Sequence, residues 1–151
     1  MRKLALSDEI LMTIDKPARY IGNELNSVIK DTSQVNIRFA MCFPDVYEIA
    51  MSHLGLKILY HTLNLREDTY CERVFAPAPD MAGLMKEEGI PLFTLETKTP
   101  VKEMDFFGFT LQYEMSFTSI LDMMQQAEVP VLAADRGEKD PIIVCGGPCA
   151  Y

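Results

Sequence analysis

Residues 35–63 constrain the fold more than any other stretch, because they combine a buried strand, a polar loop and a helix in immediate succession. Apolar side chains alternate with less apolar ones from Val35 to Cys42, which predicts a strand. Pro44 ends that strand, since proline has no N–H to donate to a neighbouring strand. Ser52 is the predicted N-cap of the following helix. The apolar face of this helix consists of Leu56, Leu59, Tyr60 and Leu63.

The rest of the chain repeats this alternation. Residues 70–75, 106–111 and 142–145 predict three further strands, and residues 91–95 predict a short one. The run 106–111 is apolar at almost every position, as expected of a parallel strand that is covered on both faces. The order of elements therefore predicts an α/β fold with a mostly parallel sheet, helices on both faces and right-handed crossovers, as in Rossmann-like and flavodoxin-like domains.

Two helices are predicted between these later strands. Asp80 is the expected cap of the first, and Gly89 suits the position after its end. Ser116 is the expected cap of the second. The predicted buried faces consist of Met81, Leu84 and Met85 in the first helix and of Phe117, Ile120, Leu121 and Met124 in the second.

The chain divides into an N-terminal helix and arm, residues 1–34, and the α/β domain, residues 35–151. Ser7 is the expected start of the N-terminal helix, and the arm Lys16–Glu24 is broken by proline and glycine. The favoured interpretation of this arm is a surface lead-in that packs on the sheet edge. The alternative is that Arg19 and Tyr20 face a catalytic domain. We expect the α/β domain to be truncated at its C-terminal end, with its last crossover and a catalytic domain outside this chain.

Composition excludes several classes of protein. The 151 residues suffice for one core, and a net charge of −8 argues against direct binding of nucleic acid or of an anionic membrane, which would need a basic face. No run of 18 apolar residues is present, so no transmembrane helix is expected. Acidic residues close behind Met1 argue against a signal peptide. Four cysteines without a disulfide-scaffold pattern favour the cytoplasm.

Several motifs in a fixed order closely resemble the N-terminal part of a group of radical S-adenosylmethionine (radical SAM) proteins, which carry a cobalamin-binding-like domain ahead of the radical barrel. The motifs are FPDVYEIAMSHLGLKILYHTLN, APAPDM, IPLFTLETKTP, GFTLQYEMSFT and GGPCAY. The resemblance extends from about Lys16 to Tyr151. Ala50 and Ala78 depart from it, because the family more often has glycine and tryptophan there, and the second departure removes a ring that could stack on a ligand.

This resemblance implies a cobalamin-binding-like module beside the catalytic barrel of the same polypeptide, which is its expected partner. The complete protein would bind a [4Fe-4S] cluster and S-adenosylmethionine outside this chain, whereas the chain alone would catalyse nothing. Cobalamin is the cofactor that the resemblance suggests for this domain. The alternative is a degenerate Rossmann-like module that binds no cobalamin and only docks on the barrel or shapes its substrate site.

The resemblance places candidate cofactor-binding residues at the carboxyl ends of the strands. Gly146 and Gly147 correspond to a glycine pair that passes the nucleotide tail of cobalamin, and paired glycines let a ligand lie against the backbone. The alternative is a tight turn. Thr110 takes the place of a family serine, and Gln112 can bond a corrin amide. Alternatively, Thr110 belongs to the core and Gln112 is a satisfied loop residue.

The loop before the first predicted helix adds Ser52, His53 and Gly55 to these candidates. The familiar cobalamin motif is Asp-x-His-x-x-Gly, but Met51 stands in the place of the aspartate and Leu56 in that of the glycine. Without the carboxylate nothing at that spacing orients the imidazole. We therefore expect His53 to line the crevice and to bond the loop, but not to ligate cobalt.

Cys145 and Cys149 have the spacing of the first two cysteines in Cys-x-x-x-Cys-x-x-Cys, the motif that holds a radical SAM cluster. The third cysteine is absent from this chain. We interpret Cys145 as a buried small apolar residue and Cys149 as a loop thiol. No metal ligands are predicted in this domain.

Overall fold

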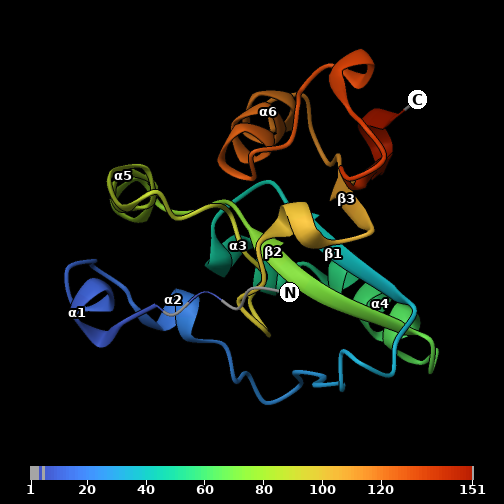
Figure 1. Cartoon of the computed structure of the whole chain (residues 1–151), viewed down its shortest axis with the longest axis horizontal. Coiled ribbons are helices and arrows are strands. Elements are labelled where there is room, and N and C mark those ends of the chain that lie inside the picture. Colours follow the sequence, from blue (N-terminus) through green and yellow to red (C-terminus); the bar gives the residue numbers. More distant parts are fainter. Residues whose placement is uncertain (1–3, 5, 151) are drawn as a thin grey trace.

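The computed structural model describes residue 4 and residues 6–150. Its sheet has four strands, β1 (Ile37–Phe43), β2 (Thr69–Phe75), β3 (Phe106–Thr110) and β4 (Ile142–Gly146). All neighbouring pairs are parallel, and the spatial order is β2-β1-β3-β4 (Figure 1). The predicted α/β class with a parallel sheet is therefore confirmed.

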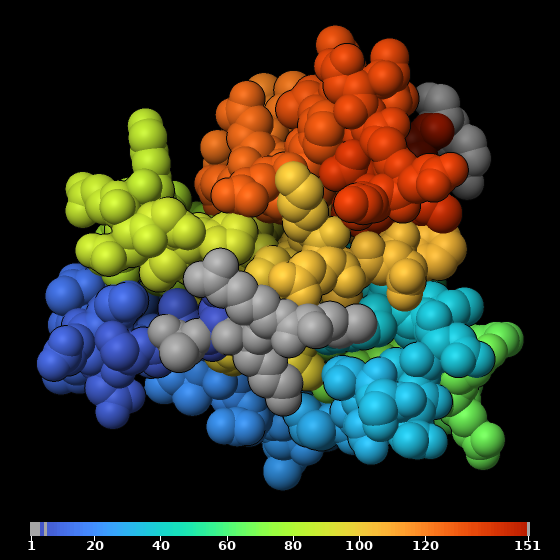
Figure 2. Space-filling view, in the orientation of Figure 1, coloured from blue at the N-terminus to red at the C-terminus, as the bar shows by residue number. Residues whose placement is uncertain are grey.

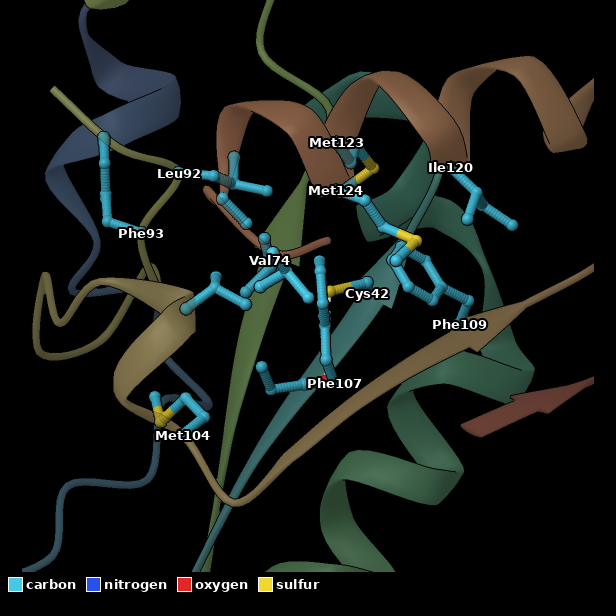
Figure 3. Packing of buried hydrophobic residues seen from close by; sticks show 14 of the residues in the cluster. Cys42, Val74, Leu92, Phe93, Met104, Phe107, Phe109, Ile120, Met123 and Met124 are labelled. Carbon is cyan, nitrogen blue, oxygen red and sulfur yellow. Dashed lines mark hydrogen bonds between the residues drawn. The ribbon is translucent and has the colours of Figure 1, made fainter. Parts of the chain in front are cut away.

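Helices cover both faces of this sheet. The main ones are α3 (Tyr47–Ser52), α4 (Leu54–Asn64), α5 (Pro79–Glu88) and α6 (Ser116–Gln126). The remaining helical segments are short: α1 (Asp8–Leu11), α2 (Ala18–Ile21), η1 (Val101–Glu103), η2 (Ala133–Asp135) and η3 (Pro148–Ala150). Helix α6 lies on one side of the sheet and α4 on the other (Figures 1 and 3). No helix in the described residues is both long and apolar enough to cross a membrane.

The larger core lies between the sheet and α6. Phe107 is fully buried and Phe109 almost fully, and their ring centroids are 4.3 Å apart. Ile120, Met123 and Met124 of α6 point toward these two rings and toward Cys42 of β1 (Figure 3). Burial of so many large apolar groups makes this the main source of stability.

A second cluster fills the opposite face between β1, β2 and the helices α3 and α4. It consists of Met41, Phe43, Ala50, Leu56, Tyr60 and Cys71. Helix α4 makes most of its contacts with β2 and fewer with β1. The half of this face that is formed by β3 and β4 has no helix of the described residues over it, and the candidate site lies there.

The free edge of β2 is covered by the loop 94–99. Leu95 N donates to the carbonyl oxygen of Arg73, and Arg73 N donates to Glu96 Oε2, each over 2.8 Å. The predicted strand 91–95 is wrong, because Phe93 forms only an isolated antiparallel bridge with Pro100. The segment folds back on its own continuation and in this way shields an edge strand from other chains.

A buried ion pair lies beneath this loop. Arg38 and Glu72 pair side chain to side chain, and both are almost fully buried. Three threonine hydroxyls of the loop bond one or the other partner, those of Thr94, Thr97 and Thr99. Such buried charges are tolerated where surrounding groups satisfy them.

Three predicted helix caps are wrong. Ser52 is the last residue of α3, a helix that the sequence did not indicate, and its hydroxyl donates to the carbonyl oxygen of Ile49 over 2.7 Å. The cap of α4 is His53 instead. Ser116 is the first residue of α6 behind Met115, and its hydroxyl is buried without a hydrogen-bond partner among the described residues. Asp80 lies within α5 and bonds the N–H of Met81 rather than preceding the helix.

Helix α6 buries only part of the predicted face, since Ile120 and Met124 are buried as predicted and Met123 is buried beside them. The other two predicted residues are exposed, Phe117 at 48% and Leu121 at 46%. Both stripes have helical spacing, so spacing alone does not select between them.

The N-terminal segment is held against the domain. Ser7 caps α1 as predicted, accepting the N–H of Ile10. The arm contains the short helix α2, which lies between its predicted breaks at Pro17 and Gly22. Arg19 pairs with Glu48 over 2.9 Å, and the hydroxyl of Tyr20 accepts the N–H of Ala78 over 3.0 Å. Figure 2 shows this segment, in blue, along the lower side of the molecule.

Candidate functional site

A groove of about 300 Å³ opens over β1, β3 and β4, beside the N-terminal half of α4. It brings together six of the seven predicted cofactor-binding residues: His53, Gly55, Thr110, Gln112, Gly146 and Gly147. Ser52 does not line it, because that residue ends α3. Carboxyl ends of parallel strands are the usual place of ligands in open α/β sheets.

The floor of the groove is apolar and flat. Met41, Gly108 and Val144 lie side by side on β1, β3 and β4. A Cβ on Gly108 would lie 2.5 Å from a ring carbon of Phe39 and 3.2 Å from a methyl carbon of Val144. Glycine at this position therefore leaves room for the ring of Phe39, from β1, to lie over the neighbouring strand β3.

His53 is the N-cap of α4. Its Nδ1 accepts the N–H of Leu56 over 3.1 Å, and its ring centroid lies 4.9 Å from that of Phe43. Because Nδ1 acts as an acceptor, the neutral imidazole carries its proton on Nε2. Gly55 leaves room for this ring, since a Cβ there would lie 2.9 Å from His53 Cε1.

Thr110 contributes a polar atom without a partner. The residue is only 6% exposed, and its Oγ1 is buried with no hydrogen-bond partner in the part of the chain that the structure describes. Buried hydroxyls are rarely left unsatisfied, and those that are call for an explanation such as a ligand or an ordered water. Gln112 lies two residues further along the groove and is partly buried.

The two glycines at the C-terminal end of β4, Gly146 within the strand and Gly147 directly after it, have different surroundings. Gly147 has a φ of +117°, and a Cβ there would overlap the carbonyl oxygen of Leu111. Its positive φ and the close approach of Leu111 leave no room for a side chain or for a ligand at this position. Gly146 has no atom within 4 Å of an added Cβ. Only Gly146 leaves open space for a ligand beside the backbone.

A link joins the loops at the carboxyl ends of β1 and β3. The hydroxyl of Tyr113 donates to Asp45 Oδ2 over 3.2 Å. The negative charge of Asp45 raises the pKa of Tyr113, so the donor stays protonated at neutral pH. This contact ties the loop after β3 to the loop after β1 through the hydroxyl of Tyr113.

Sequence reasoning missed the groove floor, namely Phe39, Met41, Leu59, Gly108 and Val144. A glycine inside an otherwise apolar strand was the one available signal, because such a glycine often marks a close approach. Cys145 also lines the groove and is exposed, so its interpretation as a buried residue is wrong. No three His, Cys, Asp or Glu side chains of the described residues gather as a metal site would require.

Comparison with known proteins gives one family match. The family described as "Radical SAM proteins, N-terminal" matches residues 55–151, which include all of α4 except its first residue, all strands after β1 and most of the groove residues. No curated protein and no solved structure matches the chain.

Proposed function

Because the chain belongs to the family of radical SAM protein N-terminal domains, we propose that it is the cobalamin-binding module beside the catalytic barrel of a radical SAM iron–sulfur enzyme. The family implies that the parent protein uses a [4Fe-4S] cluster and S-adenosylmethionine. The barrel of the same polypeptide is the partner that we propose for this domain.

The unpartnered hydroxyl of Thr110 in an apolar, glycine-lined groove is the observation that carries the proposal. A ligand with a polar rim and a flat apolar body would satisfy this hydroxyl and cover the floor at Gly108. The open backbone at Gly146 leaves a passage for an extended tail. When bound, cobalamin supplies a cobalt centre for alkyl-group or one-electron chemistry.

His53 does not fit the role of a cobalt ligand. A ligating Nε2 must present its lone pair, whereas Nδ1 of this ring accepts a backbone N–H and leaves the proton on Nε2. Met51, in the place of the motif's aspartate, offers no carboxylate to reverse this tautomer. Cobalamin would therefore be held by its corrin face and tail alone.

Titration of the complete protein with cob(II)alamin tests both parts of this proposal. We expect binding, and we expect paramagnetic resonance to show no nitrogen splitting that disappears in His53→Ala. Thr110→Val should weaken binding while thermal unfolding stays close to that of the parent, because the hydroxyl has no partner within the described fold. Gly137→Ala, at an open position outside the groove, is the control.

The second candidate, a docking or substrate-shaping module without cobalamin, is favoured by the same commitment of His53 to the helix cap. Failure of the complete protein to bind any form of cobalamin would select it. Histidine-dependent nitrogen splitting would instead overturn the claim that His53 does not ligate cobalt.

A further inference from the structure

A second cavity lies beside α4, and no residue lines both this cavity and the groove. It has a volume of about 630 Å³ and opens between residues 24–28, which follow the arm, and the helix α4. Val28, Met51 and Leu56 contribute apolar walls. Cavities of about 300–1,000 Å³ with mostly apolar walls are typical of small-molecule sites. The proposed cofactor site leaves this cavity unused.

The floor of the cavity is a buried arginine with one weakly satisfied corner. Arg73 of β2 is 5% exposed, and its guanidinium lies over the ring of Tyr60, 4.8 Å from the centroid. Its Nε donates to Glu96 over 2.6 Å and its Nη2 to Glu24 over 2.8 Å. Among the described residues, Nη1 donates only to the thioether sulfur of Met51, over 3.3 Å. Because a thioether is a weak acceptor, an oxygen atom of a ligand would be a better partner for Nη1.

The outer wall of the cavity is fixed without a ligand. The N–H of Val28 donates to the hydroxyl of Tyr60 over 2.8 Å, and the carbonyl oxygen of Val28 accepts the hydroxyl of Tyr70 over 3.0 Å. Nη2 of Arg73 also donates to Ser27 Oγ over 2.8 Å. These bonds hold residues 24–28 in place, so a ligand would not have to bear the cost of ordering a loop.

The charges around the cavity differ between its floor and its mouth. At the floor, Glu24 and Glu96 already balance the guanidinium, so Nη1 needs only a neutral acceptor such as an amide oxygen. At the mouth, Lys57 and His61 are exposed and lie one turn apart on α4, and neither side chain bonds another described residue. Helix α4 contains no acidic residue, although the chain carries a net charge of −8. The mouth therefore favours a negatively charged group.

We propose that this cavity binds a small organic acid, with a neutral oxygen at one end of an apolar body and a carboxylate or phosphate at the other. The oxygen accepts Nη1 of Arg73, and the body lies against Met51 and Leu56. The anionic group faces Lys57 and His61. An apolar wall with a few placed polar groups is the usual composition of a ligand site.

N-acetyl-phenylalanine is the probe that tests this proposal, because it combines an amide oxygen, an apolar ring and a carboxylate. Its carboxamide lacks the charge, 3-phenylpropanoate lacks the amide, and its phosphonate analogue tests the phosphate alternative. Fluorine NMR of the complete protein gives the readout, from a trifluoromethyl-phenylalanine in place of Leu25, which is fully exposed at the rim. The same label in place of Glu87, an exposed residue of α5 outside the cavity, is the control.

We expect the acid to shift the label at Leu25 but not the label at Glu87, and to bind at least about fivefold more tightly than its carboxamide or 3-phenylpropanoate. Lys57→Gln combined with His61→Gln should remove the preference over the carboxamide. Lys139→Gln, exposed in the loop before β4, should leave that preference unchanged.

The absence of a shift at Leu25 with both the acid and its phosphonate would overturn the proposal. Equal affinity for the acid and the carboxamide would overturn the role of Lys57 and His61, and equal affinity for 3-phenylpropanoate that of Arg73. Tighter binding of the phosphonate would support the proposal with phosphate as the anionic group. No probe requires cobalamin and neither label lines the groove, so this test can fail while the proposed cofactor site stands.

Discussion

At the scale of single residues, the adjacent glycines Gly146 and Gly147 differ in backbone conformation and in the space around them. Gly147 combines a positive φ with a carbonyl oxygen where its Cβ would lie, whereas Gly146 has open space. We expect Gly147→Ala to reduce the free energy of unfolding by about 1–3 kcal/mol or more, since strain and overlap add. Gly146→Ala should change it by less than about 0.5 kcal/mol. Urea unfolding of both variants measures these free energies. Equal losses in the two variants would contradict the different roles given to Gly146 and Gly147.

The hydrogen bonds of Asp80 make the stability of the fold depend on pH in the acid range. Its carboxylate accepts the N–H of Asp15 over 2.9 Å and that of Met81 over 2.8 Å, and these bonds lower its pKa below 3.8. A lowered pKa in the folded state gives stability that is present above the unfolded value and lost as the pH falls through the folded value.

We therefore expect Asp80→Asn to melt lower than the parent at pH 7, with the difference narrowing as the pH falls below about 4. Melting curves from pH 7 to pH 3 measure this. Glu87→Gln, at an exposed carboxylate on the same helix, is the control. A difference between Asp80→Asn and the parent that stays constant with pH would refute the role of these two bonds.

At the scale of elements, side chains of β3 and α6 together form much of the larger core. Phe109 is 3% exposed and touches Phe107, so Phe109→Ala should cost about 3–5 kcal/mol of unfolding free energy. Phe117→Ala removes the same group from an exposed position and should cost less than about 1 kcal/mol in this chain. Similar denaturation midpoints for the two variants would show that the packing of β3 is misassigned.

Elements were predictable where one local signal dominated. The strands β2, β3 and β4 were predicted within about one residue of their observed bounds. For β3 the signal is its apolar run, because an inner parallel strand needs apolar side chains on both faces. The face of α6 and the segment 91–95 were not predictable, since both depend on what lies opposite. A backbone donor such as the N–H of Leu95 reaches its acceptor on Arg73 only through tertiary folding.

The site was predictable in part, for a related reason. Thr110 and Gly146 are the last residues of their strands, so chain order alone places them at one end of the sheet. The floor at Phe39 and Gly108 depends on which strands are neighbours and in which register, and β1 and β3 are not consecutive in the chain. His53 was expected to bond the loop, but it bonds the N–H of Leu56 in the first turn of α4, and its role as a cap depends on the unforeseen helix α3.

At the scale of the whole molecule, the domain should hold no iron–sulfur cluster by itself. Cys145 and Cys149 are two thiolates at most, and a radical SAM cluster needs three. Anaerobic reconstitution followed by iron and sulfide assay should give one [4Fe-4S] cluster for the complete protein and none for residues 1–151. A stoichiometric cluster that is lost in Cys145→Ala would contradict this assignment.

The central position of β1 has a consequence for synthesis on the ribosome. This strand is made first, yet it lies between β2 and β3, and the N–H of Arg38 bonds Asp105, which is 67 residues later in the chain. At about 5–20 residues per second, translation takes roughly 3–13 s to supply that partner. During this interval the edge of β1 that later pairs with β3 has no strand beside it. The nascent chain is therefore most in need of a chaperone before β3 leaves the exit tunnel.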